Sequence, residues 1–323
     1  MDELISLIGQ YKELGIDTQI DYEKFYLYSI ITHSTAIEGS TVTEIENQLL
    51  FDEGISAKGK TIMEQMMNLD LKRAYEESIR EAKAHSSITI DLLKNLASLV
   101  MKNTGSIYET ALGNFSSADG DIRLVNVTAG VGGKSYMSFQ KVPSRLKEFC
   151  DWLNGERAKN MSMADRYALS FEAHYRLVTI HPWADGNGRM ARLMMNHLQF
   201  ESGLIPAKVL KEDKGEYINA LIATRENEDI HYFVNFMTEE LIKTVTSDID
   251  AFLKSMEESG EKKQNSREKI LALLKQDPSF TTRKLAETIG ISPKAIEKQL
   301  AKLKAEGIIE RDGPDKGGKW KVL

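Results

Sequence analysis

The chain has 323 residues, of which 41% are hydrophobic and 28% charged, a composition typical of globular proteins rather than of disordered or collagen-like chains. Its apolar runs are far shorter than the ~18 residues that a membrane-spanning helix needs, and its acidic first residues lack the basic start of a signal peptide. A single cysteine, Cys150, permits no internal disulfide. We therefore expect a cytoplasmic protein with no membrane partner.

Charge is unevenly distributed along the chain. Residues 261–323 contain 15 of the 42 Lys and Arg and 9 of the 48 Asp and Glu, a net charge of +6, so residues 1–260 hold 27 and 39, a net charge of −12. A basic end on an acidic body predicts an acidic partner for that end. A solvated lysine-rich surface would give the same numbers, so charge alone favours neither interpretation.

Apolar residues at helical spacing predict a mainly α body over residues 1–258. Leu4, Ile8 and Tyr11 share one face of a first helix. Alternating apolar residues around a glycine-rich turn predict one β-hairpin, over 121–139. The remaining periodic segments predict helices over 22–37, 61–84, 89–102, 143–154, 163–180, 188–202, 215–224 and 230–256.

A small second domain is predicted after a linker. Residues 259–265 are polar, contain a glycine and lack apolar periodicity, as linkers do. Residues 266–323 then follow the order helix, helix, turn, helix, hairpin, and Ser292 and Pro293 begin the third helix as N-cap and first residue. This order is the outline of a winged helix-turn-helix domain, and it leaves two partners open, DNA or another protein.

The densest group of chemically active side chains is His-Pro-Trp-Ala-Asp-Gly-Asn-Gly-Arg-Met-Ala-Arg, residues 181–192. Pro182 ends the preceding helix, so His181 lies at its exit, where an imidazole can take a proton. The next helix begins at glycines, and the free N–H groups of a helix start attract anions.

Charged side chains complete this group. Arg189 and Arg192 are three residues apart, so they lie on one side of the new helix and can hold a polyphosphate. Asp185 is the hard oxygen ligand that Mg²⁺ shares with phosphates. Taken singly, a helix-end histidine or an Asp-Gly turn is usually structural. The joint arrangement predicts a nucleotide site.

These residues resemble the signature of the Fic family, His-x-Phe-x-Asp/Glu-Gly-Asn-Gly-Arg-x-x-Arg, with Trp183 in place of Phe. The resemblance extends over roughly residues 20–240. It implies a fold of the mainly α class, a Fic helical bundle with a β-hairpin flap, here followed by the winged helix-turn-helix domain. It also implies the transfer of AMP from ATP to a Tyr, Thr or Ser hydroxyl of a target protein, with release of pyrophosphate.

By this resemblance His181 is the general base that deprotonates the hydroxyl, and Asp185 holds Mg²⁺ between the α- and β-phosphates. Gly188 bears on the type of reaction, because the related Doc phosphotransferases carry Lys there and bind the nucleotide reversed; glycine favours adenylylation. The phosphate contacts implied for the other positions are an anion hole at Gly186, Asn187 and Gly188, the β-phosphate at Arg189 and the γ-phosphate at Arg192.

Far upstream, Ser34-Thr35-Ala36-Ile37-Glu38-Gly39 resembles the family's inhibitory motif, Ser/Thr-x-x-x-Glu-Gly/Asn. Its place before the core implies an N-terminal inhibitory helix over about residues 22–38, carrying Ser34 and Glu38. There Glu38 would pair with Arg192 and block the γ-phosphate site. Without the Fic signature, the same residues would indicate only a last-turn Glu before a Gly that ends a helix.

The hairpin 121–139 resembles the flap on which the family docks its target by adding a strand, although a plain covering hairpin has the same pattern. Tyr217 lies where the family often lines its adenine pocket, and core packing explains it equally well. Two functional alternatives stay open. Glu38 could orient water and make the protein a deadenylylase of the same target, or the chain could be a DNA-binding transcriptional regulator that only senses ATP. A homodimer is also left open.

Overall fold

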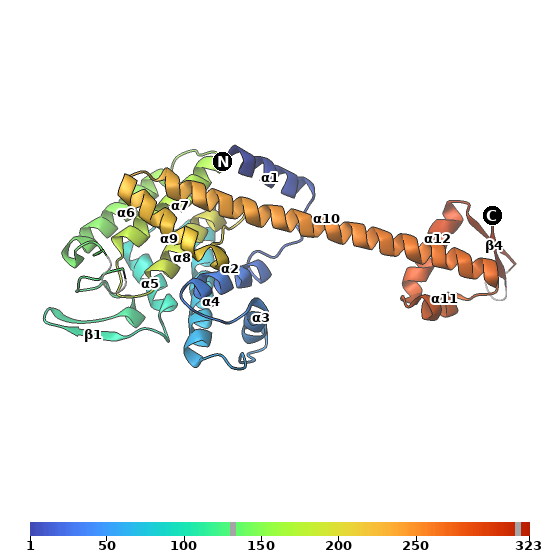
Figure 1. The fold of residues 1–323 in the computed structure, drawn as a ribbon, viewed down its shortest axis with the longest axis horizontal. Coiled ribbons are helices and arrows are strands. Elements are labelled where there is room, and N and C mark those ends of the chain that lie inside the picture. The colour runs from blue at the N-terminus through green and yellow to red at the C-terminus, as the bar shows by residue number, and fades with distance from the viewer. Residues whose placement is uncertain (130–133, 314–317) are drawn as a thin grey trace. The chain divides into compact units, whose positions relative to one another are not determined.

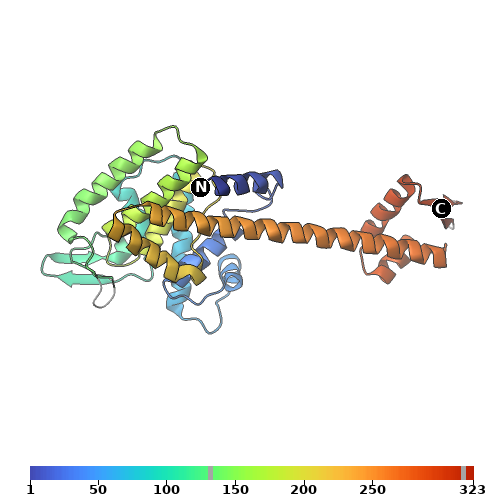
Figure 2. The same cartoon turned by 45° about the horizontal axis from the view of Figure 1, so that its top comes forward.

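The computed structural model describes residues 1–129, 134–313 and 318–323, and of residues 258–265 it describes only the backbone. Contacts divide the chain into two compact units, Met1–Ser247 and Asp248–Leu323. Each unit is mainly helical (Figure 1, Figure 2), so the predicted fold class is confirmed. In the part of the chain that is described, no helix combines the length and the apolar character that crossing a membrane requires.

Helices of the first unit begin and end close to their predicted bounds. Thr61 and Ser162 cap two of them, each accepting a hydrogen bond from the N–H group three residues on, while the carboxylate of that residue bonds back. The helix α3 is absent from the predictions, although Thr43 and Glu46 form the same capping box. The helices are α1 (Asp2–Glu13), α2 (Phe25–Ile37), α3 (Glu44–Asp52), α4 (Ile62–Lys83), α5 (Ile90–Val100), α6 (Val142–Arg157), α7 (Met163–Ile180), α8 (Asn187–Glu201), α9 (Lys214–Asn227) and the first part of α10 (His231–Gln276), with the short 3₁₀ helices η1 (Ser117–Asp119), η2 (Phe139–Lys141) and η3 (Lys211–Asp213).

The central helix of the first unit is α8, which packs against both α7 and α4 (Figure 1). Met190, Leu193 and Met194 on this helix are at most 1% exposed. Arg189 and Arg192 on the same helix are 3% exposed, so two cations lie where water hardly reaches them. A buried charge needs an oppositely charged or hydrogen-bonding partner, so the start of α8 is where a ligand site is most readily expected.

Regular strands form before the segment in which the hairpin was predicted. β1 (Ile107–Thr110) pairs antiparallel with β2 (Gly113–Ser116). Within 121–139 the chain reverses direction, but its described residues contain one isolated antiparallel bridge, Thr128 with Ser135, instead of two strands. The predicted glycine-rich turn at 130–133 lies outside the described residues. A physical reason for the missing ladder is that the buried Arg123 side chain takes carbonyl groups that a ladder would use.

The second unit contains the predicted winged helix-turn-helix. Its core is closed by apolar side chains from every element, and Gly290, with φ of +79°, ends the second helix as a left-handed cap. Ser292 caps the third helix and Pro293 is its first residue, as predicted. The elements are the end of α10, then α11 (Thr282–Ile289), α12 (Pro293–Ala305), β3 (Ile309–Asp312) and β4 (Lys319–Val322).

The backbone of the predicted linker differs from the prediction. Residues 259–265, predicted as a linker, are helical and belong to α10. Glu, Lys and Gln are good helix formers, and the single Gly260 lowers helix stability by only about 1 kcal/mol, so the absence of apolar periodicity did not end the helix. Ser266, the first residue of the predicted second domain, lies inside this helix, and its Oγ accepts a hydrogen bond from Gln299 Nε2 at 2.6 Å. We keep 1–258 and 266–323 as proposed domain bounds.

Candidate active site

The residues that resemble an inhibitory motif, 34–39, lie at the end of α2. That helix is buried along most of its length, and Glu38 is its C-cap residue. Gly39 follows with φ of +105°, a conformation that suits glycine, so the chain turns away directly after the carboxylate. The Glu38 side chain is 33% exposed, so its carboxylate is half-buried at the end of the helix.

Arg192 of α8 contacts this helix end with most of its guanidinium. Its Nη2 lies 2.6 Å from Glu38 Oε1 and 3.0 Å from the Ser34 carbonyl, and its Nε donates to Ser34 Oγ at 2.8 Å. Burial of the Glu38 carboxylate would raise its pKa, but the charge and the hydrogen bond of Arg192, together with the charges of Arg189 and Lys214, outweigh burial and leave that pKa below its ordinary value. The carboxylate is therefore ionised at neutral pH and occupies the cation of Arg192.

Buried amides hold the end of α2 in place. Asn68 of α4 is the centre of this network: its Oδ1 accepts from Thr35 Oγ1 at 2.8 Å and from Asn47 Nδ2 at 2.9 Å, and its Nδ2 donates to Ser40 Oγ at 3.1 Å. Thr35, Asn47 and Asn68 are fully buried. These bonds replace water that the buried groups have lost, so moving Glu38 away from Arg192 would disturb satisfied hydrogen bonds.

His181 ends α7 in a left-handed backbone conformation, with φ of 54° and ψ of 62°. Its Nδ1 lies 3.2 Å from the Val178 carbonyl; because a carbonyl can only accept, Nδ1 carries the ring proton and Nε2 keeps its lone pair. The ring stacks on Tyr136 with 3.6 Å between centroids. Burial lowers the pKa of His181 to about 4, so its imidazole is neutral at pH 7 and can accept a proton.

The turn after His181 is built by two side chains of the motif. Asn187 uses both ends of its amide on Trp183, donating to its carbonyl at 2.8 Å and accepting from its N–H at 3.0 Å. The indole N–H of Trp183, which is 1% exposed, donates to the Gly120 carbonyl at 3.1 Å. Trp183 therefore anchors the turn through a hydrogen bond that the phenylalanine of the family signature lacks.

Two glycines leave room at the start of α8. Gly186 has φ of +81°. A Cβ on Gly188 would lie 2.8 Å from Glu38 Oε1 and 3.1 Å from Arg192 Nη1. The first intrahelical bond runs from the Met190 N–H to the Gly186 carbonyl, so the N–H groups of Asn187 and Gly188 have no partner inside the helix and are available to a ligand. The Glu38 carboxylate therefore lies close to the backbone at which an anion would bind.

Arg189 is a buried cation with incomplete pairing. Its Nη1 donates to the Val100 carbonyl at 3.3 Å, and its Nη2 lies 3.8 Å from Asp185 Oδ1. Its buried Nε has no hydrogen-bond partner among the residues that the structure describes. Burial lowers the pKa of Arg189, yet a guanidinium stays charged at neutral pH. A buried guanidinium with a free donor beside a helix start is suited to a phosphate.

Asp185 lies on the open side of the turn. Its side chain is 60% exposed, and its Oδ1 accepts the Gly186 N–H at 2.6 Å. Over the described ranges, no group of three His, Cys, Asp or Glu side chains is arranged to hold a metal ion. A divalent ion at Asp185 would take its other ligands from phosphates and water, which is how Mg²⁺ binds in nucleotide sites, so the residues fit that ion.

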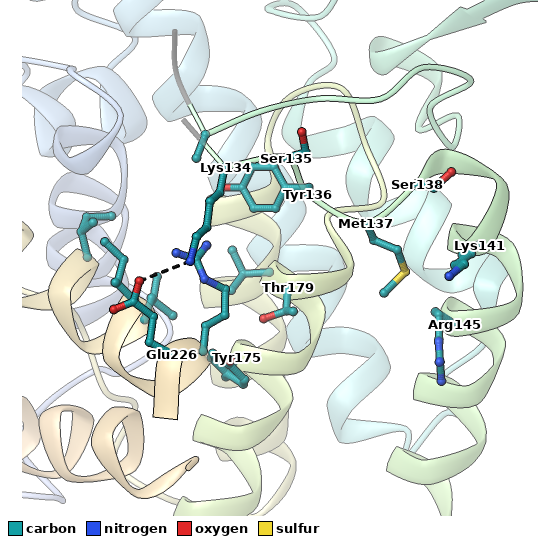
Figure 3. A pocket seen from close by; sticks show the side chains of 16 residues that line it. Lys134, Ser135, Tyr136, Met137, Ser138, Lys141, Arg145, Tyr175, Thr179 and Glu226 are labelled. Carbon is teal, nitrogen blue, oxygen red and sulfur yellow. Dashed lines mark hydrogen bonds and ion pairs between the residues drawn. The ribbon is translucent and has the colours of Figure 1, made fainter. Parts of the chain in front are cut away.

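A cavity of about 760 Å³ extends along the flap, α7 and α9, and is lined by Tyr136, the residue stacked on His181 (Figure 3). Its volume is in the range of small-molecule sites. Lys134 of the flap and Glu226 of α9 form an ion pair of 3.3 Å at this cavity. Tyr217 is not part of its lining: that side chain is 2% exposed, and its hydroxyl lies 3.0 Å from His174 Nε2.

Known proteins resemble both units. Residues 87–199 match the Fic/DOC family, and residues 264–310 match the winged helix-turn-helix DNA-binding family. The chain is a Fic/DOC domain protein. It is 29% identical over 246 residues to the protein adenylyltransferase fic-1 of Caenorhabditis elegans, 76% of this chain and 44% of that protein. It is 30% identical over 218 residues to the protein adenylyltransferase Fic of Drosophila grimshawi, 67% of this chain and 41% of that protein.

The Fic/DOC chain therefore spans about two fifths of the length of the curated relatives that it matches. A Fic domain containing signaling protein from Bacteroides thetaiotaomicron superposes with a TM-score of 0.65 at 23% identity, over 77% of this chain and 96% of that one. A Fic family protein from Desulfovibrio desulfuricans gives 0.63 at 20% identity, over 100% of this chain and 94% of that one. At these identities the likeness shows the fold.

Within the Fic domain, the structure brings Glu38 to Arg192 and places both next to the helix start that follows His181. Two residues at this site are absent from the sequence predictions. Tyr136 lies in the predicted flap, but a flap pattern does not mark the residue that meets His181. Arg123 donates to the His181 carbonyl, and its only signal was a lone arginine between apolar neighbours.

Proposed function

We propose that this Fic domain protein is a protein adenylyltransferase, which transfers AMP from ATP to a Tyr, Thr or Ser hydroxyl of a target protein and of itself. The observation that carries the proposal is the neutral imidazole of His181 next to a helix start with two buried arginines. A base beside an anion site suits the attack of a hydroxyl on a phosphate. Matched relatives about 30% identical are protein adenylyltransferases, which supports the same reaction.

In this reaction the hydroxyl oxygen attacks the α-phosphorus of ATP. His181 Nε2 takes the hydroxyl proton, a bond forms between the oxygen and phosphorus, and the bond to the bridging oxygen breaks, so pyrophosphate leaves. The N–H groups of Asn187 and Gly188 and the guanidinium of Arg189 stabilise the charge of the transition state, while the Gly186 N–H is taken by Asp185. Mg²⁺ at Asp185 would neutralise further charge on the phosphates.

The substrates have separate places in this proposal. The nucleoside of ATP occupies the cavity, whose wall on α9 is formed by Ile218, Leu221 and Ile222. The target docks on the flap, residues 121–139. The flap backbone supports this, because the Ala129 N–H already bonds to the Lys134 carbonyl at 3.1 Å in the pattern of a β-ribbon, to whose edge a peptide can add.

We further propose that Glu38 restrains the transfer. Its 2.6 Å ion pair with Arg192 supports this, because the γ-phosphate of a productively bound ATP needs the same guanidinium. The half-buried carboxylate also supports the alternative reaction, in which Glu38 orients a water molecule that removes AMP from the modified protein. The two functions differ in direction, so the test has to follow AMP both onto and off the protein.

The decisive experiment uses ATP labelled at either the α- or the γ-phosphate, with wild type and Glu38→Gly and with extract of the source cells added. Adenylylation places only the α-label on protein. Loss of AMP from pre-labelled protein, seen only with Glu38 present, would favour the deadenylylase. Absence of α-label in every mixture would contradict the transferase, and AMP that stays on pre-labelled protein in the presence of Glu38 would contradict the deadenylylase.

The pH dependence of transfer should reveal the buried base. Transfer needs the neutral form of the His181 imidazole, and burial lowers the pKa of His181 to about 4. Activity is therefore present above about pH 4 and is lost as pH falls through that value. In Glu38→Gly, the rate at pH 6 should equal the rate at pH 7.5. A histidine with the ordinary pKa of about 6.5 would lose about three quarters of its base form at pH 6, and such a loss would contradict the buried geometry.

We also propose that residues 266–323 bind DNA through α12. Support comes from the family match over 264–310, from the net charge of +6 over 261–323, and from the exposed lysines Lys294, Lys298 and Lys302 on one helix. Lysines on an exposed helix of this fold can contact phosphates along a groove. This property is compatible with the transferase and would not depend on His181.

The affinity of the full chain for duplex DNA should fall steeply with salt. Three phosphate contacts give a slope of about −3 in log K against log salt, or about 40-fold weaker binding for a fourfold rise in salt. Lys298→Glu should reduce the steepness by about one unit, while Lys12→Glu, on α1 of the other unit, should leave it unchanged. A gel shift with genomic fragments that shows no binding at low salt would instead indicate a protein partner.

A further inference from the structure

Arg123 is a fully buried cation that contacts both the flap and the loop of His181. Its Nε donates to the His181 carbonyl at 2.8 Å, its Nη1 to the Val125 carbonyl at 2.7 Å, and its Nη2 to the Met137 carbonyl. Its own N–H donates to the Pro182 carbonyl at 3.0 Å. One residue therefore links both arms of the flap to the two peptide groups at the exit of α7.

His181, which Arg123 contacts, has an unfavourable backbone conformation. A left-handed backbone is rare for a residue with a Cβ, and it persists only where the surroundings hold it. The His181 N–H bonds to the Leu177 carbonyl at 3.1 Å, and the His181 carbonyl bonds to Arg123, so both of its peptide groups are fixed. From the flap, Tyr136 fixes the ring by stacking.

Arg123 is also an unusual choice for a purely structural link. Burial disfavours its charge and lowers its pKa, and the acceptors named above are neutral carbonyls of the described residues. A buried charge is generally no better for stability than a well-packed apolar side chain. The planar guanidinium does offer several donors in fixed directions, which is what holding three separate carbonyl groups requires.

We propose that Arg123 is a positioning residue that couples the flap to His181, so that the place where the target docks and the base that deprotonates it keep one fixed relation. On this view Arg123 touches neither ATP nor the reacting atoms. Its loss should slow the transfer step while leaving ATP affinity nearly unchanged, because a small misplacement of a base costs rate rather than nucleotide binding. The kinetic part of this inference rests on the proposed adenylylation.

The test compares Arg123→Met and Arg123→Lys in the full chain carrying Glu38→Gly. The matched control is Arg157→Met, which removes another largely buried arginine, 11% exposed, one that links α6 to Glu201 of α8 away from the His181 loop. We expect self-adenylylation at saturating ATP to fall about 100-fold in Arg123→Met and at least about tenfold in Arg123→Lys. ATP affinity should change less than about threefold, and Arg157→Met should melt earlier but keep its rate.

Arg123→Lys keeps a buried cation, so it decides the matter if Arg123→Met does not fold. A folded Arg123→Lys protein with an unchanged rate, or one that loses ATP affinity and keeps its maximal rate, would overturn the proposal. Amide hydrogen exchange gives a readout without activity. Exchange should accelerate in 122–129 and 134–138 for Arg123→Lys and stay unchanged there for Arg157→Met.

These readouts separate the inference from the proposed function. If the Glu38→Gly parent takes no label from ATP, the transferase proposal fails, and hydrogen exchange alone decides whether Arg123 couples the flap to the loop. If the parent is active and exchange in 122–129 and 134–138 does not respond to Arg123→Lys, the transferase stands and the coupling is wrong.

Discussion

Replacing Glu38 by glycine should raise the incorporation of AMP, into the protein itself and into its target, by about 30-fold or more. The carboxylate and the γ-phosphate compete for the guanidinium of Arg192, which Glu38 holds at 2.6 Å. Truncating one partner of a hydrogen-bonded charge pair is worth about 2–5 kcal/mol. Glu38 is 33% exposed, so we use the lower value, and about 2 kcal/mol corresponds to about 30-fold.

Matched variants make this result specific. Glu53→Gly makes the same change at the C-cap of α3 and should have no effect on the rate. The double variant Glu38→Gly with Arg192→Ala should have little activity, because the gain in Glu38→Gly comes from the Arg192 guanidinium that becomes available to ATP. If Glu38→Gly is folded and saturated with ATP but is no more active than wild type, Glu38 is a plain helix-end residue or serves the deadenylylase.

His181→Ala, tested in the Glu38→Gly protein, should lower AMP transfer by about 10²–10⁴-fold. The Nδ1 hydrogen bond to Val178 leaves Nε2 as the proton acceptor, and alanine offers none. The affinity for ATP should change little, because the phosphates are assigned to the α8 start and to Arg189 and Arg192. Label transfer and equilibrium ATP binding measure the two effects separately.

His85→Ala is the natural comparison, since His85 is another non-glycine residue with positive φ, here 50°, and its exposed ring contacts Glu201 at the opposite end of α8 from His181. It should leave transfer unchanged. Near-normal adenylylation by His181→Ala would exclude His181 as the base. A parallel loss of ATP binding would show that the imidazole serves the nucleotide rather than the hydroxyl.

The α7–loop–α8 segment could be predicted from the sequence, because its information is local. Pro182 ends one helix, the glycines begin the next, and Arg189 and Arg192 share a side by helical spacing alone. Glu38 and Arg192 are 154 residues apart in the sequence, and the spacing of apolar residues cannot predict a contact between residues so far apart. Only the resemblance to a family suggested it, and the fold was needed to bring α2 to α8.

The parts that prediction missed depend on tertiary contacts. Over 121–139 the chain reverses direction as predicted, but its described residues form one isolated bridge instead of two strands. The buried guanidinium of Arg123 takes backbone carbonyl groups that hydrogen bonds between two strands would use. The hydroxyl of Tyr217 lies next to His174 inside the core, in agreement with the core packing that was the equal alternative for this residue, and a role for Tyr217 in an adenine pocket stays a prediction. The helical backbone of 259–265 shows that a polar segment without proline can remain a helix.

The amide network behind Glu38 has a consequence for how the restraint would respond to the cell. A carboxylate built into the chain competes with ATP at an effective concentration that does not change when the protein is diluted or overproduced. Its strength therefore depends on how firmly α2 is seated, and Asn47 and Asn68 contribute to that seating through fully buried hydrogen bonds. Single substitutions at these amides would therefore change, in steps, the ATP concentration that the proposed transfer requires, without altering any residue assigned to the nucleotide.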